Sequence, residues 1–115
     1  MNPTTVSTII NPLVKTGIFK NVEDAAQNLV EDYIYRQIIC YQGIIRKMER
    51  KYGMDFARFT NYIKERAENI QSSNLSPQQK KTTSQAIMIE EDDWMDWKVA
   101  YEMLDSWLGL KNNRI

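Results

Sequence analysis

The chain has 115 residues, of which 43% are hydrophobic and 26% charged, a composition typical of one soluble globular domain. Its 15 basic and 15 acidic residues leave no net charge, which argues against nucleic-acid or membrane binding through bulk electrostatics. Because histidine is absent and no glycine-rich phosphate loop is present, we expect a protein that is not an enzyme and uses no cofactor.

The beginning of the chain has a helical pattern that a proline interrupts. Apolar residues recur at helical spacing between Val6 and Val14. Pro12 disturbs this pattern, because an interior proline loses a hydrogen bond and clashes one turn back. The alternatives are a helix kinked or interrupted near Pro12, or an extended segment at residues 4–10 followed by a very short helix. We favour the helix, which Gly17 would end in a left-handed conformation.

Residues 21–52 predict one long amphipathic helix. Asn21 is a good N-cap, apolar residues then recur at steps of three and four, and Gly53 provides the stop. About 30 residues form a rod of roughly 45 Å, so either the other helices or a second copy of the chain must cover it. Its middle is apolar nearly all round, so more than one side must be covered, and both alternatives stay open. We expect a homodimer formed through this helix. The expected dimer contacts are Ile38, Ile39, Tyr41 and Ile45.

The long helix ends in a run of cations. Arg46, Lys47, Arg50 and Lys51 suit the negative end of the helix dipole, which explains them structurally. The functional alternative is a contact patch for phosphate or an acidic partner. Arg46 and Arg50 lie one turn apart, so both could address one ligand.

The next helix is predicted to begin at Asp55. This residue is a good N-cap, and Met54 and Phe59 occupy the two positions of a hydrophobic staple. Since the corner at residues 52–54 is short, we expect this third helix to fold back against the long one as a helical hairpin.

Residues 71–86 are rich in Ser, Gln, Thr and Lys, which predicts a flexible linker. One helical turn could follow the start signal at Ser76 and Pro77. We expect this linker to act as a hinge inside a single helical domain that covers residues 1–115.

The last helix is predicted at residues 87–108. Its acidic run, Glu90 to Asp93, suits the positive end of the helix dipole and is expected to pair with the basic residues 46–51. Aromatic and apolar residues then step by three and four. They either pack against the long helix or form a docking face for another protein. The residues of the docking interpretation are Trp94, Trp97, Tyr101 and Trp107, together with Arg46 and Arg50.

The remaining sequence features concern metal binding and the cellular location of the protein. Consecutive carboxylates on a helix point round it rather than converge, so no metal site is expected. Cys40 is the single cysteine, and no apolar run reaches the roughly 18–20 residues of a membrane span. No signal peptide is visible, and we expect a cytoplasmic protein with no membrane contact.

Three motifs carry a family resemblance. The segment KTGIFKNVEDAA at residues 15–26 resembles the turn between the helices of ribbon-helix-helix antitoxins. The segments KYGMDFARF at residues 51–59 and DDWMDWK at residues 92–98 resemble the KYGMxFxxF corner and the DDWMxWK helix of small cyanobacterial and archaeal antitoxin-like proteins. This resemblance implies an antitoxin that binds and neutralises a small, ribonuclease-type toxin.

Residues 4–10 depart from the ribbon-helix-helix pattern, because they lack the basic or polar alternation of a DNA-reading strand. A DNA-binding regulator of that type is therefore the alternative to an antitoxin rather than the main interpretation. Two further alternatives are a self-contained helical bundle and a hydrolase or metal protein that uses carboxylates. The expected fold is all-α: a long central helix, a short N-terminal helix, a folded-back third helix and a C-terminal tryptophan-rich helix.

Overall fold

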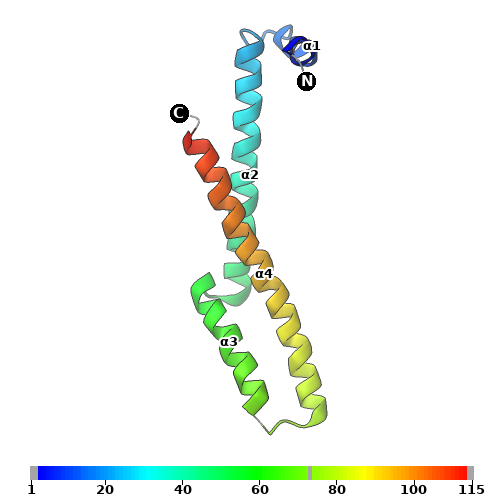
Figure 1. Ribbon diagram of the computed structural model, residues 1–115, viewed down its shortest axis with the longest axis vertical. Coiled ribbons are helices and arrows are strands. Elements are labelled where there is room, and N and C mark those ends of the chain that lie inside the picture. Colours follow the sequence, from blue (N-terminus) through cyan, green and yellow to red (C-terminus); the bar gives the residue numbers. More distant parts are fainter. Residues whose placement is uncertain (1–2, 73, 114–115) are drawn as a thin grey trace. The chain divides into compact units, whose positions relative to one another are not determined.

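The computed structural model describes residues 3–72 and 74–113, and every regular element among them is a helix (Figure 1). The four helices are α1 (Pro3–Val14), α2 (Val22–Tyr52), α3 (Phe56–Ser72) and α4 (Pro77–Asn113). The all-α class that the sequence predicted is therefore confirmed. No strand occurs within the described ranges.

Helix α1 runs through Pro12 without an interruption. The interruption that the sequence predicted at Pro12 therefore does not occur, and α1 ends two residues later, at Val14. The extended alternative for residues 4–10 is not adopted. Gly17 has a φ of 85°, the left-handed conformation that the sequence predicted after this helix.

The bounds of α2 and α3 follow from local capping. The Oδ1 atom of Asn21 accepts a bond of 2.8 Å from the backbone N–H of Asp24, which confirms the predicted N-cap. Gly53 has a φ of 63°, and its N–H donates to the carbonyl of Glu49 at the end of α2. Asp55 then caps α3 by accepting a bond of 2.8 Å from the N–H of Arg58.

Helix α4 begins ten residues before the expected start, so the predicted linker at residues 71–86 is largely incorrect. Ser76 and Gln79 form a reciprocal capping box: each backbone N–H donates to the other residue's side chain, at 3.0 and 3.1 Å. Pro77 takes the first helical position, where its missing N–H costs nothing. The described connection between α3 and α4 is therefore limited to residues 74–76.

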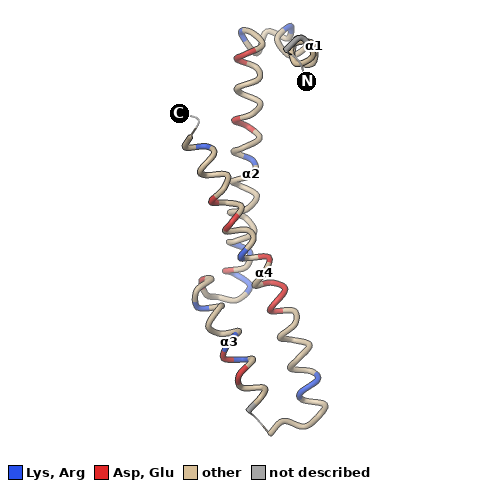
Figure 2. Tube along the Cα trace, viewed as in Figure 1, with Lys and Arg blue, Asp and Glu red and all other residues tan. Residues whose placement is uncertain are grey.

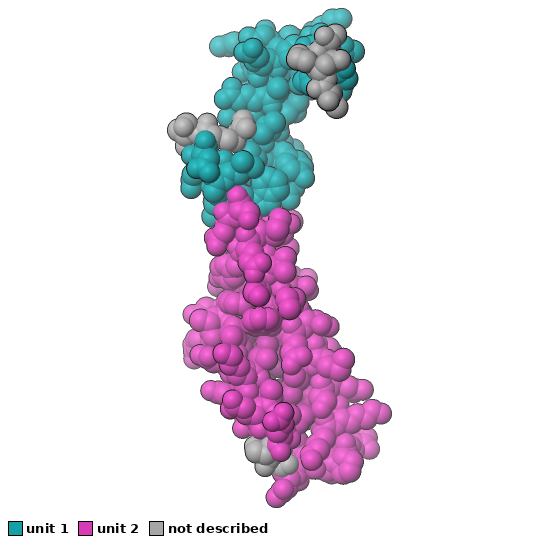
Figure 3. Space-filling view, in the orientation of Figure 1, with its two compact units in different colours: residues 1–38, 107–115 teal, residues 39–106 magenta. Residues whose placement is uncertain are grey.

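The chain divides into two compact units (Figure 3). Unit 1 comprises Met1–Ile38 and Trp107–Ile115, and unit 2 comprises Ile39–Ser106. Helices α2 and α4 therefore contribute residues to both units. Among the residues whose burial is described, the buried apolar ones of unit 1 are Ile10, Ala25, Ile34 and Ile38, and those of unit 2 are Ile45, Met48, Phe59, Ile87, Trp97 and Ala100.

Within unit 2, α3 pairs with α4 rather than folding back along α2. Its first turns meet the end of α2, where the rings of Phe59 and Tyr52 lie 4.1 Å apart. Farther along, Thr60 contacts Trp94 and Arg66 contacts Glu90, so rising numbers on α3 meet falling numbers on α4. The hairpin is therefore α3–α4, and it is antiparallel (Figure 1).

Candidate protein-binding surface

Unit 2 has an aromatic core at the place where its three helices meet. Trp97 and Phe59 are fully buried, with ring centroids 5.3 Å apart, and Ile45, Met48 and Ala100 complete the buried cluster. A buried aromatic side chain of this size contributes several kcal/mol, about 3–5 when it is truncated to alanine. This core fixes which side of α4 faces inward.

Next to the core, one carboxylate joins α4 to the end of α2. Asp93 accepts a bond of 2.6 Å from the Lys51 ammonium and a second bond from the Tyr52 hydroxyl. Burial alone would raise the pKa of Asp93, but the bonds from Lys51 and Tyr52 outweigh it and hold the pKa below its ordinary value. Burial and the bond to Asp93 raise the pKa of Tyr52. We call these three residues the Asp93 cluster.

A second inward carboxylate joins α4 to α3. Glu90 lies 3.4 Å from the guanidinium of Arg66, which also donates a bond of 2.8 Å to the Tyr62 hydroxyl. The acidic run was predicted to pair with residues 46–51. Asp93 does so through Lys51, whereas Glu90 pairs with α3 instead.

The four aromatic residues of the predicted docking face do not form one surface. Trp97 is fully buried in the core and is therefore not available to a partner, which corrects that expectation. Trp94 is half-buried and donates a bond of 2.8 Å from its indole N–H to the Thr60 hydroxyl. Trp107 belongs to unit 1, where it meets the edge of Tyr33 at 5.7 Å. Tyr101 is exposed on α4.

The predicted arginine pair and dimer contacts also separate. Arg46 and Arg50 are both exposed, and neither has an ion pair within the part of the chain that the structure describes. Ile38 and Ile45 are buried inside the chain itself, so they cannot contact a second copy in this conformation. Of the predicted dimer residues, Ile39 is exposed and Tyr41 is half-buried.

The outer side of α4 carries an apolar stripe that was not predicted from the sequence. Met88, Met95 and Val99 are 64%, 50% and 44% exposed. They are spaced by seven and four residues, so they share one side of the helix, away from Trp97 and Ala100. This spacing was available in the sequence, but the larger tryptophans next to it dominated the pattern. We call these three residues the outer stripe.

Carboxylates lie on both sides of the outer stripe. At about 100° per residue, Glu91 and Glu102 fall on one side of Met95, and Asp92 and Asp96 fall on the other. All four are exposed, and they lie within the acidic middle part of α4 (Figure 2). The outer stripe is thus an apolar surface with acidic edges.

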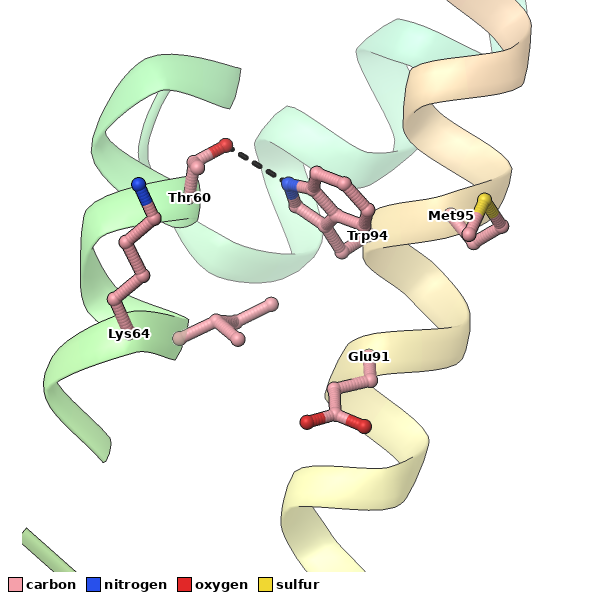
Figure 4. Close-up of a pocket in the computed structure, with 6 residues that line it drawn as sticks. Thr60, Lys64, Glu91, Trp94 and Met95 are labelled. Atoms are coloured by element: carbon pink, nitrogen blue, oxygen red, sulfur yellow. Dashed lines mark hydrogen bonds between the residues drawn. The ribbon is translucent and has the colours of Figure 1, made fainter. Parts of the chain in front are cut away.

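A pocket adjoins the outer stripe between α3 and α4. Its volume is about 340 Å³, and Met95 lines it together with Trp94 and Glu91 from α4. The α3 side is formed by Thr60, Ile63 and Lys64. Trp94 reaches across toward α3 through its bond to Thr60, while Glu91 lies one turn away on the same helix (Figure 4).

Among the described residues, no group of three or more His, Cys, Asp or Glu is placed to hold a metal ion. Within the same ranges, no helix has both the length and the apolar character needed to cross a membrane. Comparisons of the chain with protein-family models, with curated proteins and with solved structures gave no match.

Proposed function

We propose that this chain is a non-catalytic protein-binding module, a cytoplasmic antitoxin that holds and neutralises a small, ribonuclease-type toxin. The observation that carries the proposal is the outer stripe of α4. Its apolar side chains stay exposed although the same helix buries Trp97 on its other side. Exposed apolar patches with polar edges mark protein-binding sites, and methionine is common on such surfaces because it adapts to a partner.

Two observations favour a protein partner over nucleic acid. The carboxylates beside Met95 would repel phosphates, since nucleic-acid binding depends on basic side chains. A ribbon-helix-helix regulator would also need a strand near the N-terminus, where this chain has helix α1. Neither the charge of the outer stripe nor the structure of α1 therefore supports the DNA-binding alternative.

The test is affinity capture from native lysate with a charge-neutral control. The chain is used as bait in its wild-type form and with Met95→Gln plus Val99→Gln, which removes apolar surface but no charge. The matched control is Ile18→Gln, in unit 1, because Ile18 is 77% exposed. We expect a stoichiometric companion that the control retains and the double variant loses by about tenfold or more.

The identity of the companion completes the test. Under the proposal it cleaves RNA when purified alone, and adding the wild-type chain stops the cleavage. A chain that captures no companion would sink the proposal, as would a companion that the double variant retains fully. The mass of the free chain in solution tests separately the homodimer expected through α2, to which Ile39 and Tyr41 are the accessible contributors.

A further inference from the structure

We infer that the partner places a basic amphipathic helix along the outer stripe, with one bulky apolar side chain in the pocket between α3 and α4. This inference rests on the proposed function and specifies the chemistry of the partner at the same surface. It is carried by three independent features of unit 2: unpaired outward carboxylates, the spacing of the apolar residues, and the position of the pocket.

The carboxylates on the two sides of α4 differ in whether they form ion pairs within the chain. The inward carboxylates, Glu90 and Asp93, each lie against a cation of the chain itself. Among the outward ones, Glu91, Asp92 and Asp96 have no ion pair within the described residues. The chain therefore neutralises its inward acids and leaves the outward ones for another molecule.

The cations near the outer stripe are too few to neutralise its carboxylates. Lys98 lies 3.8 Å from Glu102, whose side chain is 63% exposed, and its ammonium also lies over the Trp94 ring. Lys64 borders the far side of the pocket, on α3. Four carboxylates thus face two ammonium groups, and a basic partner gains favourable pairing along both edges of the stripe, whereas an acidic one is repelled.

The spacing of the apolar residues fits a helix. From Met88 to Val99 the stripe covers three turns, about 16 Å along α4. Steps of seven and four residues are those by which one helix packs against another, with charged residues flanking the apolar seam. A partner helix with lysine or arginine at its flanking positions would meet Glu91 and Asp92 on opposite edges.

The pocket adds a place for one anchor. Met95 belongs to both the stripe and the pocket wall, so a helix lying on the stripe passes the pocket entrance. The volume of about 340 Å³ accommodates one large apolar side chain, and Trp94 and Ile63 provide apolar contacts for it. Binding energy at interfaces is concentrated in such anchors.

The experiment uses displayed peptides as the probe. A library of amphipathic helices of about 18 residues, with fixed leucines at helical spacing and flanking positions randomised among Lys, Glu and Gln, is selected on the intact full chain. We expect lysine to be enriched at the flanks, and binding of the selected peptides to weaken about tenfold or more at high salt. Their binding should also fall with Met95→Gln plus Val99→Gln.

Charge variants then locate the effect. Asp92→Asn plus Asp96→Asn should remove most of the lysine preference and of the salt dependence while the circular dichroism of the chain stays unchanged. Glu31→Gln plus Glu65→Gln removes the same charge from exposed positions on α2 and α3 and should change neither. Equal losses in both double variants would overturn the inference, because a general charge effect would then explain them.

The remaining outcomes separate the two proposals. Recovery of acidic, neutral or no peptides, or of basic peptides that bind equally to the Met95→Gln plus Val99→Gln variant, overturns the inference. A native companion lost by that variant would still uphold the proposed function in this case. Basic peptides on the stripe without any native companion would support the surface chemistry and defeat the antitoxin role.

Discussion

The two units of this protein bury their apolar residues to different degrees. Unit 2 encloses Trp97 and Phe59 completely, and the Asp93 cluster adds charged hydrogen bonds beside them. Unit 1 buries small or aliphatic side chains, such as Ala25 and Ile34, and leaves Tyr33 58% exposed. Because stabilisation follows the apolar area removed from water, unit 2 should be the more stable of the two.

The largest expected effect comes from a matched pair of tryptophans, one in each unit. Trp97→Ala empties the centre of the unit 2 core and should cost about 3–5 kcal/mol. Trp107→Ala removes a half-buried ring whose aromatic partner in unit 1 is the edge of Tyr33. This change should cost about 1–2 kcal/mol. Urea unfolding followed by circular dichroism measures both. Equal costs would contradict the difference between the units.

The second comparison uses two aspartates with different surroundings. Asp93→Asn removes the charge that accepts bonds from Lys51 and Tyr52 and should cost about 2 kcal/mol. Asp32→Asn removes an exposed ion pair with Arg36 on α2 and should cost less than about 0.5 kcal/mol. The same urea titration applies. A cost for Asp32→Asn as large as that for Asp93→Asn would show that solvent exposure does not decide how much each ion pair stabilises the fold.

The pH dependence of unit 2 follows from the same cluster. Since the folded pKa of Asp93 lies below its ordinary value of 3.8, the stability that this carboxylate contributes is complete above that value and is lost as the pH falls through the lower folded pKa. The pKa of Tyr52 is raised above 10.0, so its contribution is present below pH 10 and is lost as the pH rises through the higher folded pKa. Urea midpoints across pH should fall at both ends.

The Asp93→Asn variant provides the control for this profile. It should flatten the acid limb, because Asn at position 93 cannot be protonated in this pH range, and weaken the alkaline limb, because Asp93 helps to raise the pKa of Tyr52. An unchanged profile in the variant would assign the pH dependence to other groups.

The smallest expected effects test the turns that begin and end the helices. Gly17→Ala and Gly53→Ala place a side chain at positive φ, one in each unit, and should each cost about 1 kcal/mol. Gly43→Ala, inside α2 with open space around it, should stabilise by about 0.5–1 kcal/mol. Thermal melting of the three variants gives the signs. A stabilising Gly17→Ala or Gly53→Ala would contradict the turn geometry.

The ends of the helices could be predicted from the sequence wherever a single residue determines the local backbone conformation. Asn21 and Asp55 cap their helices as expected, and Gly17 and Gly53 adopt the left-handed conformation. The first turns of α4 could not be predicted by periodicity, because residues 77–86 are polar and show no apolar stripe. Thr83 lies beside Arg66 and Ile70 of α3 in a shallow pocket, a tertiary contact that no local pattern reveals.

The candidate site was predicted only in part for a similar reason. The step of three and four residues through Trp94, Trp97 and Tyr101 identified an apolar helix, but periodicity alone cannot decide which side packs inward. Packing against Phe59 buries Trp97, and this leaves Met95 and its neighbours outside. The orientation of α4 therefore depends on contacts with α2 and α3, which a single helix pattern does not contain.

The bond between Trp94 and Thr60 has a spectroscopic consequence. It holds an indole ring at the wall of the pocket, half-exposed, while Trp97 is shielded from solvent and Trp107 lies in unit 1. Indole emission shifts to shorter wavelength when water leaves its surroundings. A variant that keeps Trp94 and Trp97 but carries Trp107→Phe would report pocket occupancy by its own fluorescence, so the docking surface contains its own optical probe.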